Sequence, residues 1–491
     1  MYVISIDQST QGTKAILLDK DGALLCRVDK AHRQIINEKG WVSQDPEEIY
    51  QNTIEIIRHL IRKTGIDKNL VAGIAISNQR ETSLIWDATD GKPVANAIVW
   101  QCARAAEICE REEIKSHADH IFEKTGMNLS PYFPAAKIAW LLEHVEEAKT
   151  LIETGKLRCG TMDAYLIYRL TAGKSYKTDY SNASRTQLFN VFDLTWDKEI
   201  CAWFRIPAEI LPEVVDSDAL FGMTNCEGIF DKEIPIHAAM GDSHAALFGQ
   251  HCLQEGMTKA TYGTGSSIMM NIGSRPVLST HGVVTSLAWG KNGRVEYVLE
   301  GNLNYTGAVI TWLQKDLKLI DDPSETENLA RQAQKDDEVY LIPAFTGLGA
   351  PYWKPHAKAA ILGMDRTTGR AEIVRAGLEC IAYQIHDVIR AMEKDAGISL
   401  NELRVDGGPT KNTYLMQFQC DMIGSSVAVP EAEELSAIGA GYMAGLALGL
   451  WDERVFSKVK RTIYVSEMDL ALKEKKLNGW KEAVEMGGKI S

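Results

Sequence analysis

The chain has 491 residues, with 45% hydrophobic and 24% charged residues and a formal net charge of −13 at pH 7. This composition is typical of a globular protein with two large domains or three ordinary ones. The acidic balance and the lack of a long basic run argue against nucleic acids and anionic membrane surfaces as partners.

Cysteine usage and apolar segments indicate the compartment. The nine Cys residues include no Cys-x-x-Cys pair, which argues against a zinc ribbon and favours a reducing cytoplasm. An apolar, Gly-rich stretch at 436–451 is too short to cross a bilayer comfortably. We expect it to form a buried helix, with Gly441 and Gly445 on one face allowing close packing, and we expect no membrane insertion.

The first informative feature is a polar turn between two short apolar runs. Residues 2–6 and 15–18 predict strands, and residues 7–14 predict a tight turn that carries Asp7, hydroxyl groups, a Gly and Lys14. Backbone N–H groups in such a turn can hold a phosphate, and Asp7 can hold Mg²⁺ through water. An ordinary hairpin is the alternative interpretation.

A similar pattern returns about half a chain later. Residues 259–262 and 268–271 predict strands around a turn of Gly, Ser and Thr at 263–267. Two phosphate-binding hairpins, one in each half, indicate a duplicated scaffold that closes on a nucleotide.

Strands and helices alternate through both halves, which predicts an α/β protein with two lobes. Asp45 as N-cap and Pro46 at the first helical position predict a helix start. The other predicted strands and helices lie at 71–77, 97–100, 307–318, 338–342, 371–394, 403–406 and 412–423. We place the boundary near residue 248, giving domains at 1–248 and 249–491.

Asp242 is the candidate catalytic base. A strand at 234–237 leads to Gly241 and Asp242, and a helix follows. An Asp at this place is commonly a helix N-cap, while in a cleft it can take the proton from an alcohol that attacks a phosphate. His244, one turn into the helix, is expected to be packed or solvated.

Arg80 and Glu81 follow a buried strand and can each bind a hydroxyl of a polyol, although a solvated ion pair in a loop is the alternative. Trp100 can supply an apolar wall, with plain core as the alternative. Tyr132 can add a phenolic hydrogen bond, with loop packing as the alternative. A Gly turn at Gly408 can bring a nucleoside close to the backbone.

Several longer stretches resemble the FGGY family of carbohydrate kinases, and within it the members that phosphorylate glycerol. These stretches lie at 77–82, 97–102, 132–144, 178–186 and 343–353. The resemblance covers nearly the whole chain. It implies a duplicated actin-like (ribonuclease H-like) ATPase fold with two lobes and a central cleft, and it implies ATP and Mg²⁺.

The resemblance also implies site residues, position by position. The polyol pocket comprises Arg80, Glu81, Trp100, Tyr132, Asp242, Ser243 and Ser267, with Asp242 as the catalytic base. The ATP site comprises Thr10, Gln11, Gly12, Thr13, Lys14, Thr264, Gly265, Gly307, Gly408 and Asn412. The metal would be held by Asp7 through water and by Asp242. The resemblance further suggests a homo-oligomer, either a dimer or a tetramer.

Two positions depart from the pattern of the glycerol-phosphorylating members. Ser243 stands where they usually have Gln, and Ser267 where they usually have Phe. Smaller side chains at both positions predict a larger and more polar pocket. Glycerol is therefore the leading acceptor, and a four- or five-carbon polyol or ketose, such as erythritol, erythrulose or xylulose, is the alternative. A nucleotide-switching sugar sensor on the same fold is the alternative that is not an enzyme.

Overall fold

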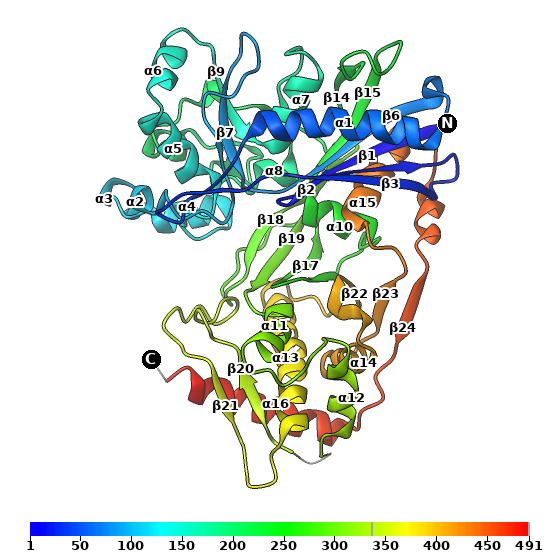
Figure 1. The fold of residues 1–491 in the computed structure, drawn as a ribbon. Helices are drawn as coiled ribbons and strands as arrows, with labels where there is room; N and C mark the ends of the chain where they lie inside the picture. Colours follow the sequence, from blue (N-terminus) through cyan, green and yellow to red (C-terminus); the bar gives the residue numbers. More distant parts are fainter. Residues whose placement is uncertain (335–336, 490–491) are drawn as a thin grey trace.

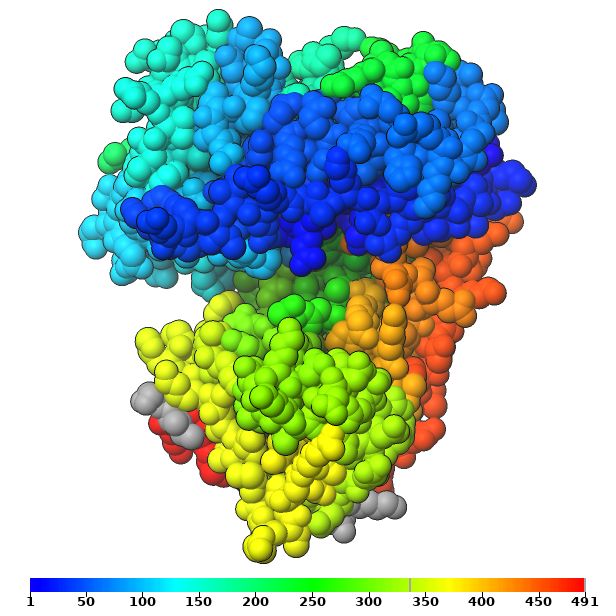
Figure 2. Space-filling model, in the orientation of Figure 1, coloured from blue at the N-terminus to red at the C-terminus, as the bar shows by residue number. Residues whose placement is uncertain are grey.

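The computed structural model describes residues 1–334 and 337–489. The chain folds into two lobes, and most of the first half of the sequence forms the upper lobe in Figure 1. Figure 2 shows that the molecule is narrower between the lobes and that its surface is recessed there. Among the described residues, no helix has the length and apolar character needed to cross a membrane.

The first lobe is built on a six-stranded sheet in the order β14-β15-β6-β1-β2-β3. Strands β1, β2 and β3 are antiparallel neighbours, whereas β6 runs parallel to β1 and β15 parallel to β6. In the order of the sheet, the strands span Leu220–Thr224, Ile234–Gly241, Val71–Asn78, Tyr2–Gln8, Gly12–Leu18 and Leu24–Ala31. A five-stranded sheet stands beside it, with strands β4 (Ile35–Ile36), β5 (Val42–Gln44), β8 (Ala97–Ile98), β7 (Ser83–Asp87) and β9 (Leu157–Thr161).

The second lobe repeats this plan in a seven-stranded sheet, ordered β18-β19-β17-β16-β22-β23-β24. Strands β19, β17 and β16 are antiparallel, and β22 and β23 continue parallel to β16, as β6 and β15 continue from β1. The strands span Val284–Lys291, Arg294–Leu303, Ser266–Gly273, Met257–Tyr262, Glu402–Asp406, Val427–Pro430 and Arg461–Tyr464. The predicted duplicated, actin-like α/β fold is therefore confirmed.

Helices cover the sheets, and three two-stranded ribbons complete the lobes. The helices of the first half are α1 (Pro46–Thr64), α2 (Ala106–Cys109), α3 (Glu112–Lys115), α4 (Ala118–Thr125), α5 (Pro134–His144), α6 (Glu146–Glu153), α7 (Met162–Leu170), α8 (Tyr180–Ala183), α9 (Lys198–Trp203) and α10 (Asp242–Gly249). Those of the second half are α11 (Gly307–Lys315), α12 (Glu325–Gln332), α13 (Arg370–Ala396), α14 (Thr413–Ile423), α15 (Leu435–Ala447) and α16 (Leu470–Gly487). The ribbons pair β10 (Lys177–Asp179) with β13 (Glu213–Val215), β11 (Phe189–Asn190) with β12 (Thr195–Trp196), and β20 (Tyr340–Ile342) with β21 (Ala360–Leu362).

The predicted elements exist, and the differences lie at their ends. Helix α1 begins as expected, because the Asp45 side chain accepts a hydrogen bond from the Glu47 N–H and Pro46 is the first helical residue. The strand expected at 97–100 is shorter, since β8 ends at Ile98. Strand β1 continues through Asp7 to Gln8, so the first turn is shorter than the sequence suggested.

Helices α10 and α15 pack together where the two lobes join. They cross so closely that a Cβ at Gly439 would lie 1.8 Å from the carbonyl oxygen of Ala245. Helix α15 is buried as expected, and it also packs on the first sheet, where Ser5 Oγ donates to the Ala437 carbonyl at 2.6 Å. A segment of the second half thus covers the first sheet, and the domain boundary near residue 248 stays a prediction.

Candidate active site

The turn between β1 and β2 spans 9–11 and is closed by its own backbone. The Ser9 N–H donates to the Gly12 carbonyl at 2.9 Å. A Cβ at Gly12 would lie 2.6 Å from the Lys30 carbonyl oxygen, so the neighbouring strand leaves room for glycine alone. Thr10 and Gln11 occupy the tip of this turn, where their backbone N–H groups can meet a phosphate.

The two faces of the β1–β2 hairpin differ. Asp7 and Lys14 are cross-strand partners and therefore share one face, while Thr13 points to the other. The Thr13 side chain is fully buried, and its hydroxyl lies 2.8 Å from His32 Nε2. Thr13 therefore cannot offer its hydroxyl to a phosphate, and its backbone is paired within the sheet, between Gln8 of β1 and Lys30 of β3.

Asp7 and Asp242 lie close enough to influence each other electrostatically. Burial raises the pKa of Asp7 to about 6, against the lowering effect of Lys14, and the charge of Asp242 raises it further. The Ser77 hydroxyl donates to Asp7 at 2.9 Å. No group of three or more His, Cys, Asp or Glu side chains suited to a metal occurs in the described part of the chain. Two carboxylates suit Mg²⁺, which in kinases commonly combines one or two carboxylates with water and substrate phosphates.

Asp242 opens helix α10 without acting as its N-cap. The N-cap is Gly241, and Asp242 Oδ1 accepts a hydrogen bond from the adjacent Ser243 N–H at 2.6 Å. The N-cap interpretation is therefore wrong. Oδ1 also lies 3.3 Å from Arg80 Nε, and 35% of the Asp242 side chain is exposed. An oriented and accessible carboxylate of this kind can accept a proton from a bound alcohol.

His244 is packed, as the sequence analysis expected. Its side chain is fully buried and lies 3.3 Å from the Ser286 hydroxyl through Nε2. Burial and, to a smaller extent, the nearby Arg80 charge lower the pKa of His244 well below its ordinary value. It is a neutral core group behind Asp242.

Arg80 and Glu81 are buried, so the interpretation as a solvated loop pair is wrong. They pair with Glu300 and Arg185 instead of with each other: Arg80 binds both oxygens of Glu300 at 2.8 and 2.9 Å, and Arg185 Nε donates to Glu81 at 2.7 Å. Glu81 has a φ of 61°, a left-handed conformation that costs a non-Gly residue about 1 kcal/mol. The surrounding ion pairs hold it there.

Trp100 and Tyr132 form one partly buried aromatic wall. Their ring centroids are 5.9 Å apart in an edge-to-face arrangement. The Trp100 indole N–H donates to the Thr10 hydroxyl at 2.9 Å, which links the wall to the first phosphate turn. Lys137 donates to the backbone carbonyls of Pro131 and Tyr132 and thereby fixes the Tyr132 segment.

The second Gly turn rests on the start of helix α11. The Gly263 N–H donates to the Gly265 carbonyl at 2.8 Å, and the Gly307 N–H donates to the Gly263 carbonyl at 2.9 Å. A Cβ at Gly265 would lie 2.1 Å from the Leu303 carbonyl oxygen. Thr264 and Gly265 thus stand beside Gly307, as the predicted ATP site requires.

Gly307, Gly408 and Asn412 line one largely apolar cavity of about 490 Å³. Its walls also include Ile310, Pro323, Thr326, Leu378 and Leu415. The Asn412 amide caps helix α14 by accepting from the Leu415 N–H at 2.9 Å, and it donates to the Thr326 hydroxyl at 3.0 Å. An apolar slot with a few fixed polar groups suits a nucleoside.

Sequence reasoning missed Glu300 and the role of Arg185. The Ser267 hydroxyl donates to Glu300 at 3.3 Å, so this predicted pocket residue touches the same ion cluster. The sequence did contain a signal for Glu300, because this residue directly follows the apolar residues Tyr297, Val298 and Leu299 in a strand. A carboxylate in such a strand predicts a buried cationic partner.

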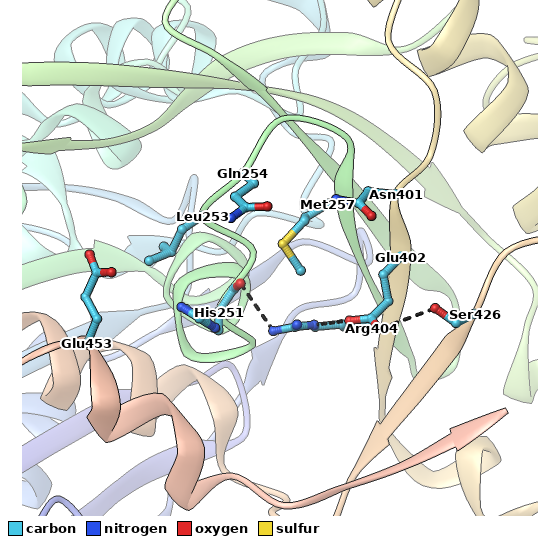
Figure 3. A pocket seen from close by; sticks show the side chains of 9 residues that line it. All are labelled: His251, Leu253, Gln254, Met257, Asn401, Glu402, Arg404, Ser426 and Glu453. Carbon is cyan, nitrogen blue, oxygen red and sulfur yellow. Dashed lines mark hydrogen bonds and ion pairs between the residues drawn. The ribbon is translucent and has the colours of Figure 1, made fainter. Parts of the chain in front are cut away.

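Another cavity, of about 470 Å³, lies away from these residues (Figure 3). Its lining includes Met257 and Glu402, the first residues of β16 and β22. The predicted ATP residues lie at the opposite end, after the last residues of these two strands. Arg404 crosses it and binds Glu402 and the His251 carbonyl. The cavity is therefore separate from the candidate active site.

Comparisons with known proteins agree with this geometry. The N-terminal domain of the FGGY family of carbohydrate kinases matches residues 2–249, and its C-terminal domain matches residues 258–448. The chain is 46% identical to a glycerol kinase of Alkaliphilus oremlandii, covering 98% of this chain and 96% of that protein. It is also 46% identical to glycerol kinase 1 of Thermotoga maritima, covering 99% of each.

Solved structures give the same result. The crystal structure of Plasmodium falciparum glycerol kinase with ADP has a TM-score of 0.94 and 37% identity, covering 99% of this chain and 98% of that one. A xylulose kinase from Lactobacillus acidophilus shares the fold with a TM-score of 0.88 and 23% identity, covering 99% and 98%. The chain therefore belongs to the FGGY family of carbohydrate kinases and is an ATP-using phosphotransferase with an alcohol acceptor.

Proposed function

We propose that this kinase transfers the γ-phosphoryl group of ATP to a terminal hydroxyl of glycerol, giving glycerol 3-phosphate. The observation that carries the proposal is the placement of Asp242, an accessible carboxylate 3.3 Å from Arg80 and electrostatically coupled to Asp7. The glycerol kinases at 46% identity support glycerol as the acceptor.

The side chains then have distinct roles. Asp242 takes the proton of the attacking hydroxyl, while Arg80 and Glu81 bind the other hydroxyls. The Trp100 and Tyr132 rings contact the carbon chain, and Ser243 and Ser267 complete the pocket. Closure of the lobes would exclude water and so limit hydrolysis of ATP.

The nucleotide and its metal would lie between the two phosphate turns, one from each lobe. The turns at Thr10–Lys14 and at Thr264–Gly265 would hold the phosphates, and Gly307, Gly408 and Asn412 would contact the nucleoside. Mg²⁺, held by Asp7 through water and by Asp242, would neutralise charge that develops on the phosphates. The donor set fits such an ion, because hard oxygen ligands dominate it.

The test is Asp242→Asn. We expect kcat to fall by about a hundredfold or more, since general-base catalysis contributes about 10²–10⁴ in rate, while ADP binding measured without Mg²⁺ stays unchanged. Asp231→Asn removes an exposed carboxylate that pairs with Lys68 at 2.6 Å, and it serves as the control. Near-normal turnover in Asp242→Asn would remove Asp242 from the role of base.

One observation favours a larger acceptor as a second candidate. Ser267 places a hydroxyl on the pocket side of Glu300, which makes this wall polar. A panel of three- to five-carbon polyols and ketoses, compared by kcat/KM, separates glycerol from erythritol, erythrulose or xylulose. ATP binding without phosphorylation of any member would favour the sugar-sensor alternative instead.

We further infer that the protein works in the cytoplasm and forms a dimer or tetramer. All nine cysteines are free and eight are buried, as expected for a reducing compartment. The oligomer is inferred from the family resemblance, and light scattering of the purified protein tests it.

A further inference from the structure

A buried cluster of charges joins the two lobes beside Asp242. Glu300 lies on β19 of the second lobe, and its partners Arg80 and Arg185 follow β6 and α8 of the first lobe. Figure 1 shows β18 and β19 below α8, at the junction of the lobes. The exposed fractions of the three side chains are 0%, 6% and 1%, so water contributes little to balancing their charges.

Both oxygens of Glu300 are occupied by these partners. Oε1 accepts from Arg80 at 2.8 Å and from Ser267 at 3.3 Å, and Oε2 accepts from Arg80 at 2.9 Å. Arg185 Nη1 lies 2.9 Å from Oε2, as an ion pair. Glu300 has no oxygen left for a substrate, so any effect on catalysis must act through its partners, the two arginines and Ser267.

Besides Glu300, each arginine also contacts one residue of the predicted polyol site. Arg80, held by a bidentate pair, presents Nε to Asp242 at 3.3 Å. Arg185 uses Nε to hold Glu81 at 2.7 Å, in its left-handed backbone conformation. The hydroxyl-binding residues and the base are therefore all anchored, directly or through one arginine, to a carboxylate on the opposite lobe.

We propose that Glu300 is a positioning residue for the polyol site, which couples the arrangement of the lobes to the placement of Arg80, Glu81 and Asp242. This inference rests on the proposed function of the site. When the two lobes separate, Arg80 loses its partner, and the polyol site is complete only with the second sheet in place.

Loss of the Glu300 charge has a defined consequence. Among the described residues, Asp242 at 3.3 Å would be the ion-pair partner left to Arg80, with the Glu81 charge also near, and Arg80 would pair with Asp242 more fully. Held in that pair, Arg80 would no longer bind a substrate hydroxyl from its original position, so glycerol binding weakens while the ATP site is left unchanged.

The experiment compares Glu300→Gln with Glu296→Gln. Glu296 lies on the same strand and accepts from the Asn271 side chain at 2.8 Å, without contact to either arginine. We expect Glu300→Gln to lower kcat/KM for glycerol by at least about tenfold, mainly through a higher KM for glycerol, and to leave KM for ATP within about twofold. We expect the control to keep the kinetics of the wild type.

A second variant covers the case that Glu300→Gln fails to fold. Arg185→Lys keeps the charge, but one ammonium group cannot replace the two nitrogens that contact Glu81 and Glu300. KM for glycerol should rise at least about threefold, with KM for ATP unchanged. Folded variants with wild-type glycerol kinetics would overturn the inference while leaving the proposed function intact. A wild-type chain that phosphorylates no polyol would instead overturn the proposed function.

Discussion

His32 gives the first lobe a measurable sensitivity to acid. The Asn52 amide donates to the Ala31 carbonyl at 3.1 Å and lies 3.0 Å from His32 Nδ1. Because Asn52 is oriented as a donor, Nδ1 must accept, and the ring proton therefore lies on Nε2, which donates to the Thr13 hydroxyl at 2.8 Å. The buried ring is neutral, and burial lowers the pKa of His32 from 6.5 to about 4.

The sign and size of the effect follow from linkage. The unfolded chain takes up a proton near pH 6.5, whereas the folded protein does so near pH 4, so stability falls as the pH drops through this window. Between pH 7 and 5 the loss is about 2 kcal/mol, from 1.36 kcal/mol per unit of pKa difference. Protonation would also force the Asn52 amide or Nδ1 to give up its hydrogen bond.

The assay is urea unfolding of the wild type, His32→Gln and His59→Gln at several pH values. Other buried groups, such as Asp7 with its raised pKa, titrate in the same range, but they cancel in the difference between variants. The wild type should lose about 2 kcal/mol more than His32→Gln between pH 7 and 5. His59 is exposed, and its variant should follow the wild type. Equal slopes for the wild type and His32→Gln would refute the assigned tautomer and neutral state.

Three further predictions address other parts of the molecule. Burial lowers the pKa of Lys137 to about 7 from the 10.5 expected in the unfolded chain. Because the unfolded chain then binds more protons above pH 7, the free energy of unfolding should rise by about 1 kcal/mol per pH unit above pH 7. Urea titrations should show this rise in the wild type and not in Lys137→Met. Trp100→Phe removes the hydrogen bond to Thr10 and should raise KM for both ATP and glycerol about fivefold in steady-state assays. Gly439→Ala places a Cβ 1.8 Å from the Ala245 carbonyl and should lower the free energy of unfolding by at least about 3 kcal/mol.

The fold was predictable where the signal is local. The Asp45–Pro46 start of α1 and the Gly turn before Ser266 depend on neighbouring residues alone, and both are present. Element ends were less predictable because tertiary pairing sets them. Asp7 reads as a turn residue, but it pairs with Lys14 and Ser77 in the sheet, so β1 continues past it. Likewise β8 is only as long as its partners, β5 and β7, allow.

Burial explains why parts of the candidate site escaped sequence reasoning. Judged alone, Arg80 and Glu81 resemble a solvated pair, because a sequence does not show that Glu300, 220 residues away from Arg80, neutralises the guanidinium. Buried ions are tolerated only with such partners, so each unexplained charge in an apolar strand implies another charge elsewhere. The buried charge of Glu300 is neutralised by two cations from the opposite lobe, Arg80 and Arg185. The need to neutralise buried charges across the two halves therefore restricts which residues can form the site. Local sequence patterns do not show this restriction.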